Sequence, residues 1–401
     1  MSAGSTQPSL QTLADGARAA GRLALDTEFM GEGRYRTLLC LVQLAIPEGA
    51  DTGERIALVD PLAADLDMAP LAAVLADPSV QVVVHAGRQD IALMRRRLQT
   101  EVSNVFDTQI AAGFAGLGAQ SSYDSLLTEM LGLRLAKSAS FTRWDARPLS
   151  PEQLAYARED VVHLLELSGE LEQRLAELGR LEWAREECQP LERSSDERDP
   201  EAIFARLPRI GGLGAAARPV ARELVRWREQ TAARQDRPVQ SVLGDAALME
   251  VAKRAPSSRA ELERIRGVGG GIGKGRLGDD LLDAVRRGRA QPPDPAPERP
   301  RLPSSKPDDA PLVALAEALL RARAREAGLA YELLAARADL QAIVAAHRAG
   351  GEEADVRTLR GWRRRLVGDE LLELLDGRVS LSVNESGRGR RVQVELKPTS
   401  G

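Results

Sequence analysis

The hydrophobic pattern of the first 190 residues combines two periods. Short, nearly continuous apolar runs predict strands, and apolar residues three or four positions apart predict helices. We expect strands over residues 22–29, 37–46, 55–60 and 80–85, and helices over residues 68–76, 88–98 and 151–178. This alternation predicts an α/β domain with a mixed sheet and flanking helices.

After residue 190 helical spacing dominates, and polar or proline-rich stretches divide the chain. Residues 191–200 are polar and predict a linker or a helix cap, and the proline-rich residues 291–308 predict an extended, semi-rigid linker. Helices are expected over 205–290 and 310–377, with a glycine-rich loop at 267–275 and a short hairpin over 379–396 around residues 384–387. We therefore expect an α/β domain over 1–195, a helical domain over 200–290, the linker over 291–308 and a C-terminal helical domain over 309–401.

Charge is distributed unevenly along the chain. The whole protein has a net charge of −4, but residues 201–290 contain 18 Lys and Arg against 11 Asp and Glu, a net charge of +7. A basic segment beside an acidic remainder fits a phosphate-binding domain next to a metal-binding one. The alternative is that these arginines lie on ordinary solvated helix faces.

The sequence provides little support for a cysteine metal site, a phosphate-binding loop, secretion or a membrane location. Cys40 and Cys188 are far apart and match no metal-ligand spacing, which fits a reducing cytoplasm. The glycine-rich residues 269–274 fail the spacing of a phosphate-binding loop, because Val268 and Gly275 stand where Gly and Ser/Thr are required. Neither a signal peptide nor an apolar stretch of membrane-spanning length is visible. We expect a cytoplasmic protein with no membrane partner and no organic cofactor.

Four acids and one tyrosine are candidates for catalysis. Asp26 and Glu28 are two positions apart at the end of the first strand, so their side chains share one face. Buried carboxylates are costly unless a hard cation compensates them. Asp90 falls in the first turn of a helix, where an acid also favours the helix dipole. Tyr156 and Asp160 are four positions apart and share a helix face. Each position taken alone also fits an ordinary surface or capping residue.

The order of these residues resembles a known group of enzymes. An Asp-x-Glu pair on a first strand, an Asp after a later strand and a Tyr-x-x-x-Asp on a last helix are similar to the DEDD 3′→5′ exonucleases, in their tyrosine-bearing branch. Over roughly residues 10–190 the chain resembles the ribonuclease D family in particular. The matching segments are Asp26-Thr27-Glu28-Phe29, Leu41-Val42-Gln43-Leu44, His85-Ala86-Gly87-Arg88-Gln89-Asp90, Phe106-Asp107-Thr108-Gln109, Lys137-Ser138-Ala139-Ser140-Phe141-Thr142-Arg143-Trp144, Arg147-Pro148-Leu149 and Tyr156-Ala157-Arg158-Glu159-Asp160.

The resemblance implies a fold and a reaction. The fold is a ribonuclease H-like mixed sheet, and the reaction is hydrolysis of RNA from its single-stranded 3′ end to nucleoside 5′-monophosphates, with tRNA precursors as the substrate typical of the family. Two divalent ions, Mg²⁺ or Mn²⁺, are the implied cofactors. The resemblance makes Asp26, Glu28, Asp90 and Asp160 their ligands, and Tyr156 the group that orients the attacking water and helps to remove its proton.

Residues beside these motifs are candidates for RNA contact. An exposed aromatic side chain could stack on a terminal base, polar groups at strand ends could contact the terminal nucleotide, and the loop before the last motif could clamp the strand. These candidates are Phe29, Gln43, His85, Lys137, Arg143 and Trp144. Each also fits a core or surface role, and His85 in particular fits a structural histidine at the end of an apolar strand.

The helical segments resemble HRDC domains, which usually bind nucleic acid. Leu224-Val225-Arg226-Trp227-Arg228 carries the match in the first segment and makes Arg226, Trp227 and Arg228 candidate contacts. Residues 310–377 resemble a second, diverged copy more distantly. From this division we expect that removing residues 200–401 weakens substrate binding and spares hydrolysis.

Three other functions stay open at this point. A DNA exonuclease on the same scaffold would differ in how it treats the 2′-hydroxyl group, which the candidate residues do not decide. A non-catalytic nucleic-acid-binding protein would require the loss of a metal ligand, whereas all four acids are present. A basic scaffold that recruits protein partners would use the C-terminal half alone, and the sequence indicates no particular partner.

Overall fold

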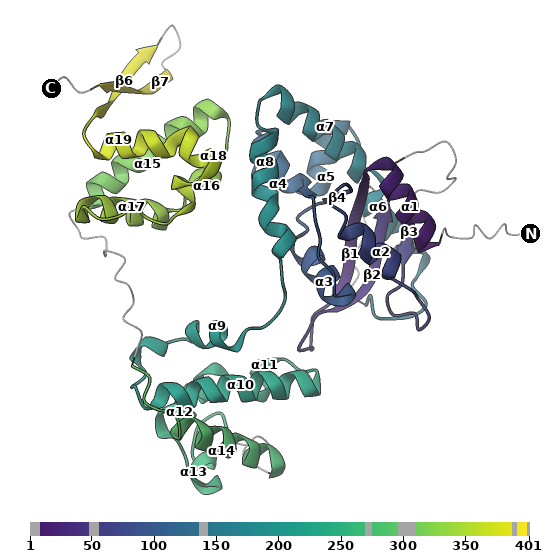
Figure 1. The fold of residues 1–401 in the computed structure, drawn as a ribbon, viewed down its shortest axis with the longest axis vertical. Coiled ribbons are helices and arrows are strands. Elements are labelled where there is room, and N and C mark those ends of the chain that lie inside the picture. Colours follow the sequence, from purple (N-terminus) through teal and green to yellow (C-terminus); the bar gives the residue numbers. More distant parts are fainter. Residues whose placement is uncertain are drawn as a thin grey trace, which may run out of the picture.

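The computed structural model describes residues 9–47, 56–135, 143–268, 275–295, 309–386 and 391–398. Three parts are visible in Figure 1: an α/β part up to residue 193, a central part over 200–295 and a C-terminal part over 309–398. Within the described residues, the helices are all too short or too polar to cross a membrane.

Five strands form the sheet of the α/β part, in the order β3-β2-β1-β4-β5. They are β1 (Arg22–Met30), β2 (Leu38–Ala45), β3 (Ile56–Val59), β4 (Gln81–Val84) and β5 (Val105–Asp107). Strand β2 is antiparallel to β1 and β3, whereas β4 is parallel to β1 and β5. The predicted mixed sheet is confirmed with its four predicted strands. Strand β5 was not predicted, because three residues are too few to show a period.

Helices cover both faces of this sheet. They are α1 (Leu10–Ala20), α2 (Ala69–Leu75), α3 (Arg88–Leu98), α4 (Thr108–Phe114), α5 (Tyr123–Leu126), η1 (Leu127–Leu131), α6 (Pro151–Val162), α7 (Leu164–Glu177), α8 (Leu181–Cys188) and η2 (Gln189–Arg193). Leu23 and Leu25 of β1 pack with α1, α2 and α3 on one face. Ala24 packs with Val161 and Leu164, at the junction of α6 and α7, on the other. Asp26 therefore belongs to the face that α6 covers.

Helix α6 begins with a strong local signal and ends earlier than the sequence pattern predicts. The Ser150 hydroxyl accepts a hydrogen bond from the Gln153 amide, the Gln153 side chain accepts one from the Ser150 amide, and Pro151 occupies the first turn. The prediction of one helix over 151–178 is wrong. The backbone leaves the helical conformation at His163, so that α6 lies on β1 to β3 and α7 on β4 and α4. Apolar spacing continues across the break and hides it.

The central part is helical, as predicted, and has its own core. Its elements are α9 (Pro200–Ala205), η3 (Ile210–Gly212), α10 (Ala217–Gln235), α11 (Val239–Val242), α12 (Asp245–Arg254), α13 (Arg259–Glu263) and α14 (Gly275–Arg289). The glycine-rich residues 269–274 lie outside the described residues. Tyr35, from the loop between β1 and β2, joins this core at its edge and donates a hydrogen bond to Glu229 of α10.

The C-terminal part is a second group of helices followed by a hairpin. Its elements are α15 (Ala310–Ala327), α16 (Tyr331–Leu334), α17 (Arg337–Ala349), η5 (Arg357–Leu359), α18 (Gly361–Arg363), η6 (Arg364–Gly368), α19 (Asp369–Leu375), β6 (Val379–Ser386) and β7 (Arg391–Pro398). The predicted hairpin is confirmed, but its turn comes later than expected. Asn384 pairs with Gln393 inside the strands, and residues 387–390 lie outside the described part.

The C-terminal part shares one hydrophobic core with the α/β part. Trp362 of α18 stacks on Trp183 of α8, with ring centroids 5.4 Å apart, and meets the edge of Phe114 of α4. Buried apolar residues of α4, α7 and α8 continue this cluster into α15, α17 and α19. Polar contacts at the edge include Arg363 with Glu187, 2.8 Å apart. Figure 1 accordingly places α18 beside α8.

Candidate active site

Strand β1 and helix α6 bring three carboxylates together. Asp26 and Glu28 project from the same face of β1, and Asp160 projects from α6, which lies across that face. One oxygen of each carboxylate lies within 4.8 Å of one oxygen of each of the others. The Tyr156 hydroxyl, one turn before Asp160, forms a hydrogen bond with the Asp160 carboxylate. Four of the five predicted catalytic residues therefore meet at one place.

Asp90 lies behind this cluster at the start of α3 and is buried. Its carboxylate accepts a hydrogen bond from the hydroxyl of Thr27, the residue between the two acids of β1. Asp90 is close enough to raise the pKa of both Asp26 and Glu28 by charge repulsion. It thus lies near the three carboxylates, although it is not part of the set within 4.8 Å.

The turn that leads to Asp90 is held by Asp107, whose role the sequence motif did not reveal. The Asp107 carboxylate accepts hydrogen bonds from the backbone amides of Ala86 and Gly87 and also caps α4. A side chain at position 87 would place its Cβ only 2.5 Å from Val84, so glycine is required there. Asp is a preferred residue at the start of a helix, so Asp107 at the end of an apolar run could have been predicted as the N-cap of α4.

Burial and mutual repulsion hold the site carboxyls above their ordinary pKa. Burial, followed by the charges of Asp160 and Asp90, raises the pKa of Glu28 to about 8. Burial, followed by the charge of Glu159, raises the pKa of Asp160 to about 7. For Asp26, burial and the charge of Asp90 raise the pKa well above its usual range. Without a cation, the folded protein therefore favours the protonated forms at this site.

These residues fit a divalent cation. Hard oxygen ligands from two elements converge within 4.8 Å, and the repulsion that raises their pKa values is what a bound cation would remove. Within the described ranges, Asp26, Glu28 and Asp160 have no ion pair with a basic side chain.

Comparisons with known proteins agree with this geometry. A family model described as 3′-5′ exonuclease matches residues 4–176, and one described as HRDC domain matches residues 217–285. The chain is 37% identical to ribonuclease D of Acidiphilium cryptum over 97% of this chain and 95% of that one. It is 39% identical to ribonuclease D of Gluconacetobacter diazotrophicus over 90% and 89% of the two chains.

The chain belongs to the ribonuclease D family. The crystal structure of Escherichia coli RNase D, described as an exoribonuclease involved in structured RNA processing, matches with a TM-score of 0.76 and 30% identity over 92% of this chain and 96% of that one. The predicted fold, an α/β nuclease domain followed by helical HRDC-type structure, is therefore confirmed. This exonuclease family uses divalent metals, in agreement with the acidic cluster.

Within this ribonuclease D scaffold, two of the predicted RNA contacts are corrected by their burial. Gln43 is 0% exposed and pairs with Asp26 across β1 and β2, so its side chain is covered in this structure and is not presented to a terminal nucleotide. Both polar atoms of its side-chain amide lack a hydrogen-bond partner among the described residues. Trp144 is 3% exposed and packs beside the Tyr156 ring, with centroids 6.1 Å apart. It packs against Tyr156 and does not offer a stacking surface in this structure.

The other contacts predicted near the site have different environments. Phe29 is 36% exposed and Arg143 is exposed, so both remain available to a substrate. Arg143 also pairs with Asp145 at 3.0 Å. The His85 ring forms a hydrogen bond with the Thr108 hydroxyl, and burial lowers its pKa, so it is neutral at pH 7. Lys137 lies outside the described residues.

Two of the three contacts predicted on α10, Trp227 and Arg228, are corrected as well, and Arg226, whose side chain is 43% exposed, stays a prediction. Trp227 is buried in the core of the central part. Arg228 is 2% exposed, and its guanidinium binds the Leu243 carbonyl and the Asp245 carboxylate. Arg226 pairs with two glutamates, at 2.6 and 2.7 Å. Two residues of the motif that resembles an HRDC domain therefore serve the packing of the central part.

Proposed function

We propose that the protein is a 3′→5′ exoribonuclease that trims RNA from a single-stranded 3′ end, with tRNA precursors as its substrate. Two divalent ions, Mg²⁺ or Mn²⁺, are its cofactors. The observation that carries this proposal is the convergence of Asp26, Glu28 and Asp160 from β1 and α6. The ribonuclease D relatives support the choice of RNA, since they match this chain over nearly its full length.

The site residues have two proposed roles: the four acids bind the ions, and Tyr156 orients the attacking water. Asp26, Glu28 and Asp160 would hold one ion, with Asp26 shared and Asp90 supporting the second from behind β1. When bound, such ions make a nucleophile available at neutral pH and offset the charge that develops on the leaving oxygen. Burial and the nearby carboxylates raise the pKa of Tyr156, so its hydroxyl would stay protonated and orient the attacking water by hydrogen bonding. Its predicted help in removing the proton of that water stays a prediction.

The helical parts are proposed to serve substrate binding and architecture. Residues 200–290 bind nucleic acid, and residues 309–401 are a second, diverged HRDC domain. The order of elements supports this second assignment. In both parts a long helix (α10, α15) is followed by a four-residue helix (α11, α16) and then by a helix of at least ten residues (α12, α17).

A time course of cleavage tests the proposed activity. We expect 3′-extended RNA to shorten from its 3′ end in Mg²⁺ or Mn²⁺, with no cleavage in EDTA and slower cleavage of matched single-stranded DNA. Asp26→Asn should lower the rate on the order of 10³-fold or more, because it removes a charged ligand. Asp15→Asn is the control, since Asp15 is an exposed acid of α1.

The same time course separates the alternatives. Faster cleavage of DNA would move the protein to a DNA exonuclease on the same scaffold. RNA binding without cleavage under any ion would leave a non-catalytic binding protein. The protein is expected in the cytoplasm, where its RNA substrates are made, and fractionation of cells checks that location.

A further inference from the structure

The central part contains a groove of about 1050 Å³ that the catalytic site does not use. It lies between α12 and two turns, one at Arg209 and one at residues 264–267. Five basic side chains line it and are exposed. Arg254 is paired with Glu250, and the other four are Arg209, Lys253, Arg264 and Arg266.

These four cations differ from most arginines of the protein. Within the described residues, no acid lies within ion-pair distance of any of the four. The two acids that line the groove are already occupied: Asp245 pairs with the buried Arg228, and Glu250 pairs with Arg254, each at 2.6 Å. The groove therefore presents four basic side chains that form no ion pair within the described chain.

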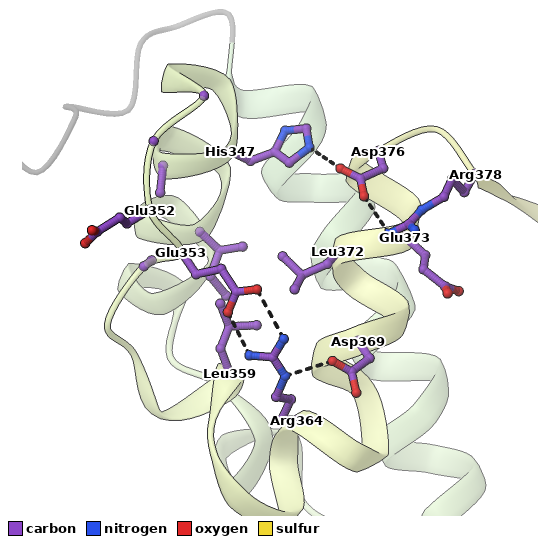
Figure 2. A pocket seen from close by; sticks show the side chains of 15 residues that line it. His347, Glu352, Glu353, Leu359, Arg364, Asp369, Leu372, Glu373, Asp376 and Arg378 are labelled. Carbon is purple, nitrogen blue, oxygen red and sulfur yellow. Dashed lines mark hydrogen bonds and ion pairs between the residues drawn. The ribbon is translucent and has the colours of Figure 1, made fainter.

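A pocket of about 720 Å³ in the C-terminal part provides a contrast. Figure 2 shows His347 pointing to Asp376, and Arg364 lying between Glu353 and Asp369. Its basic groups are thus paired with acids, and acids outnumber them among the lining residues. The uncompensated positive charge belongs to the central part and is not a general property of the helical domains.

We propose that this groove binds the sugar–phosphate backbone of the RNA substrate, at nucleotides far from the 3′ end that is cleaved. The proposal rests on the exoribonuclease function and names its binding surface. Exposed arginine and lysine side chains are suited to phosphate oxygens. The described residues that line the groove include no aromatic side chain, so it has no surface for base stacking and contacts RNA independently of sequence.

The separation between the groove and the carboxylates determines which RNA substrates can contact both. Figure 1 shows α12 and α13 well apart from the sheet that carries the carboxylates. A short oligonucleotide bound at the carboxylates cannot extend to α13, whereas a long or structured RNA can. The groove therefore affects the affinity for long substrates and leaves cleavage of short ones unchanged.

A pair of matched double variants tests this inference. Arg264→Gln with Arg266→Gln removes two cations of the groove. The control, Arg286→Gln with Arg321→Gln, removes two exposed arginines that already have acidic partners outside it. The binding of a 3′-extended, structured RNA is measured in EDTA by fluorescence anisotropy at about 50 to 200 mM salt. Cleavage is measured on the same RNA and on an oligonucleotide of about five nucleotides.

We expect the groove variant to bind the long RNA roughly ten-fold more weakly, with the salt dependence of log Kd reduced by roughly one unit of slope per cation. Its KM for the long RNA should rise while kcat, and all constants for the short oligonucleotide, stay unchanged. Lys253→Gln should give a smaller change in the same direction. The control variant should behave as wild type.

Two results would overturn the inference: unchanged affinity and salt dependence in the groove variant, or an equal loss in the control. A wild-type protein that binds RNA but cleaves none would remove the exoribonuclease function and leave the binding comparison intact. Failure of the groove and failure of the activity are therefore distinguishable.

Discussion

At the scale of single residues, the carboxylates of Asp26, Glu28 and Asp160 lower the stability of the ion-free fold when they are charged. Buried carboxyls that repel one another are a cost in the ion-free protein and become an advantage when cations bind. The pKa of Glu28 is about 8 and that of Asp160 about 7, both above the values of an unfolded chain. Such carboxyls hold their protons more tightly in the folded state. Their contribution to stability is therefore present at low pH and is lost as the pH rises through 7 and 8.

This sign gives a pH prediction. In EDTA, the free energy of unfolding should fall as the pH rises from about 5 to about 8, by on the order of 5 kcal/mol. The double variant Glu28→Gln, Asp160→Asn should show a flatter profile, because it has lost the two titrating groups. Mg²⁺ should stabilise the wild type more at high pH than at low pH. Urea unfolding across this range measures all three effects, and a wild-type profile that rises with pH would contradict the argument.

Gln43 is a second residue whose burial has a measurable consequence. Its amide is buried without a partner in the described chain, whereas the buried amide of Gln153 is hydrogen-bonded to Ser150. Removing an unpartnered polar group removes its desolvation cost. We therefore expect Gln43→Leu to raise the free energy of unfolding in EDTA by about 1 kcal/mol, and Gln153→Leu to lower it by a similar amount. Denaturant titration checks the pair, and destabilisation by both changes would mean that the Gln43 amide has a partner after all.

At the scale of elements, α6 is decisive because it carries both Tyr156 and Asp160. Its start is set by the capping box of Ser150 and Gln153. Its end at His163 follows from packing, since α6 extends over β1 to β3 whereas α7 extends over β1, β4 and α4. Placement of the catalytic groups therefore depends on a local signal at one end and on tertiary contacts at the other.

The cap of α6 should influence catalysis as well as stability. Ser150→Ala removes the acceptor for the Gln153 amide and should cost about 1 kcal/mol of unfolding free energy. Because the cap orients the helix that carries Tyr156, kcat should fall as well. Ser258→Ala removes the cap of α13 in the central part and should cost similar stability while leaving kcat on a short oligonucleotide unchanged. Equal kcat values in the two variants would show that the cap does not position the site.

At the scale of the whole molecule, the C-terminal part is joined to the nuclease by a common core. Sequence division into domains predicts that residues 200–401 can be removed without loss of hydrolysis. The structure changes that expectation, because Trp362 is fully buried between Trp183 of α8 and Phe114 of α4. Truncation would expose the apolar surfaces of α4, α7 and α8 to water.

We therefore expect a protein that ends at residue 295 to have a lower Tm and less activity, even on a short oligonucleotide. Trp362→Ala should reproduce part of this effect and cost about 3 to 5 kcal/mol. Trp227→Ala is the control, because Trp227 is buried in the separate core of the central part. Thermal unfolding and short-substrate cleavage measure these effects. Full activity and an unchanged Tm after truncation would show that the nuclease folds independently.

Much of the catalytic centre was predictable from sequence alone. Strands β1 and β4, helix α3 and the start of α6 follow from apolar runs, spacing and caps, which are local properties of the chain. The order of Asp26, Glu28, Asp90, Tyr156 and Asp160 along these elements then resembles a two-metal nuclease. In the folded chain Asp26, Glu28 and Asp160 lie together, with Asp90 near them, which agrees with that interpretation.

Only the tertiary structure decided which polar and aromatic side chains are available to a ligand. Gln43, Trp144, Trp227 and Arg228 occupy positions that a motif marks as functional, yet segments distant in sequence cover them. The shared core at Trp362 and the four basic side chains around α12 that have no ion pair in the described chain likewise depend on which faces meet. The physical reason is common to all of these: local sequence determines how an element forms and which face is apolar, whereas burial and charge pairing depend on what packs against it.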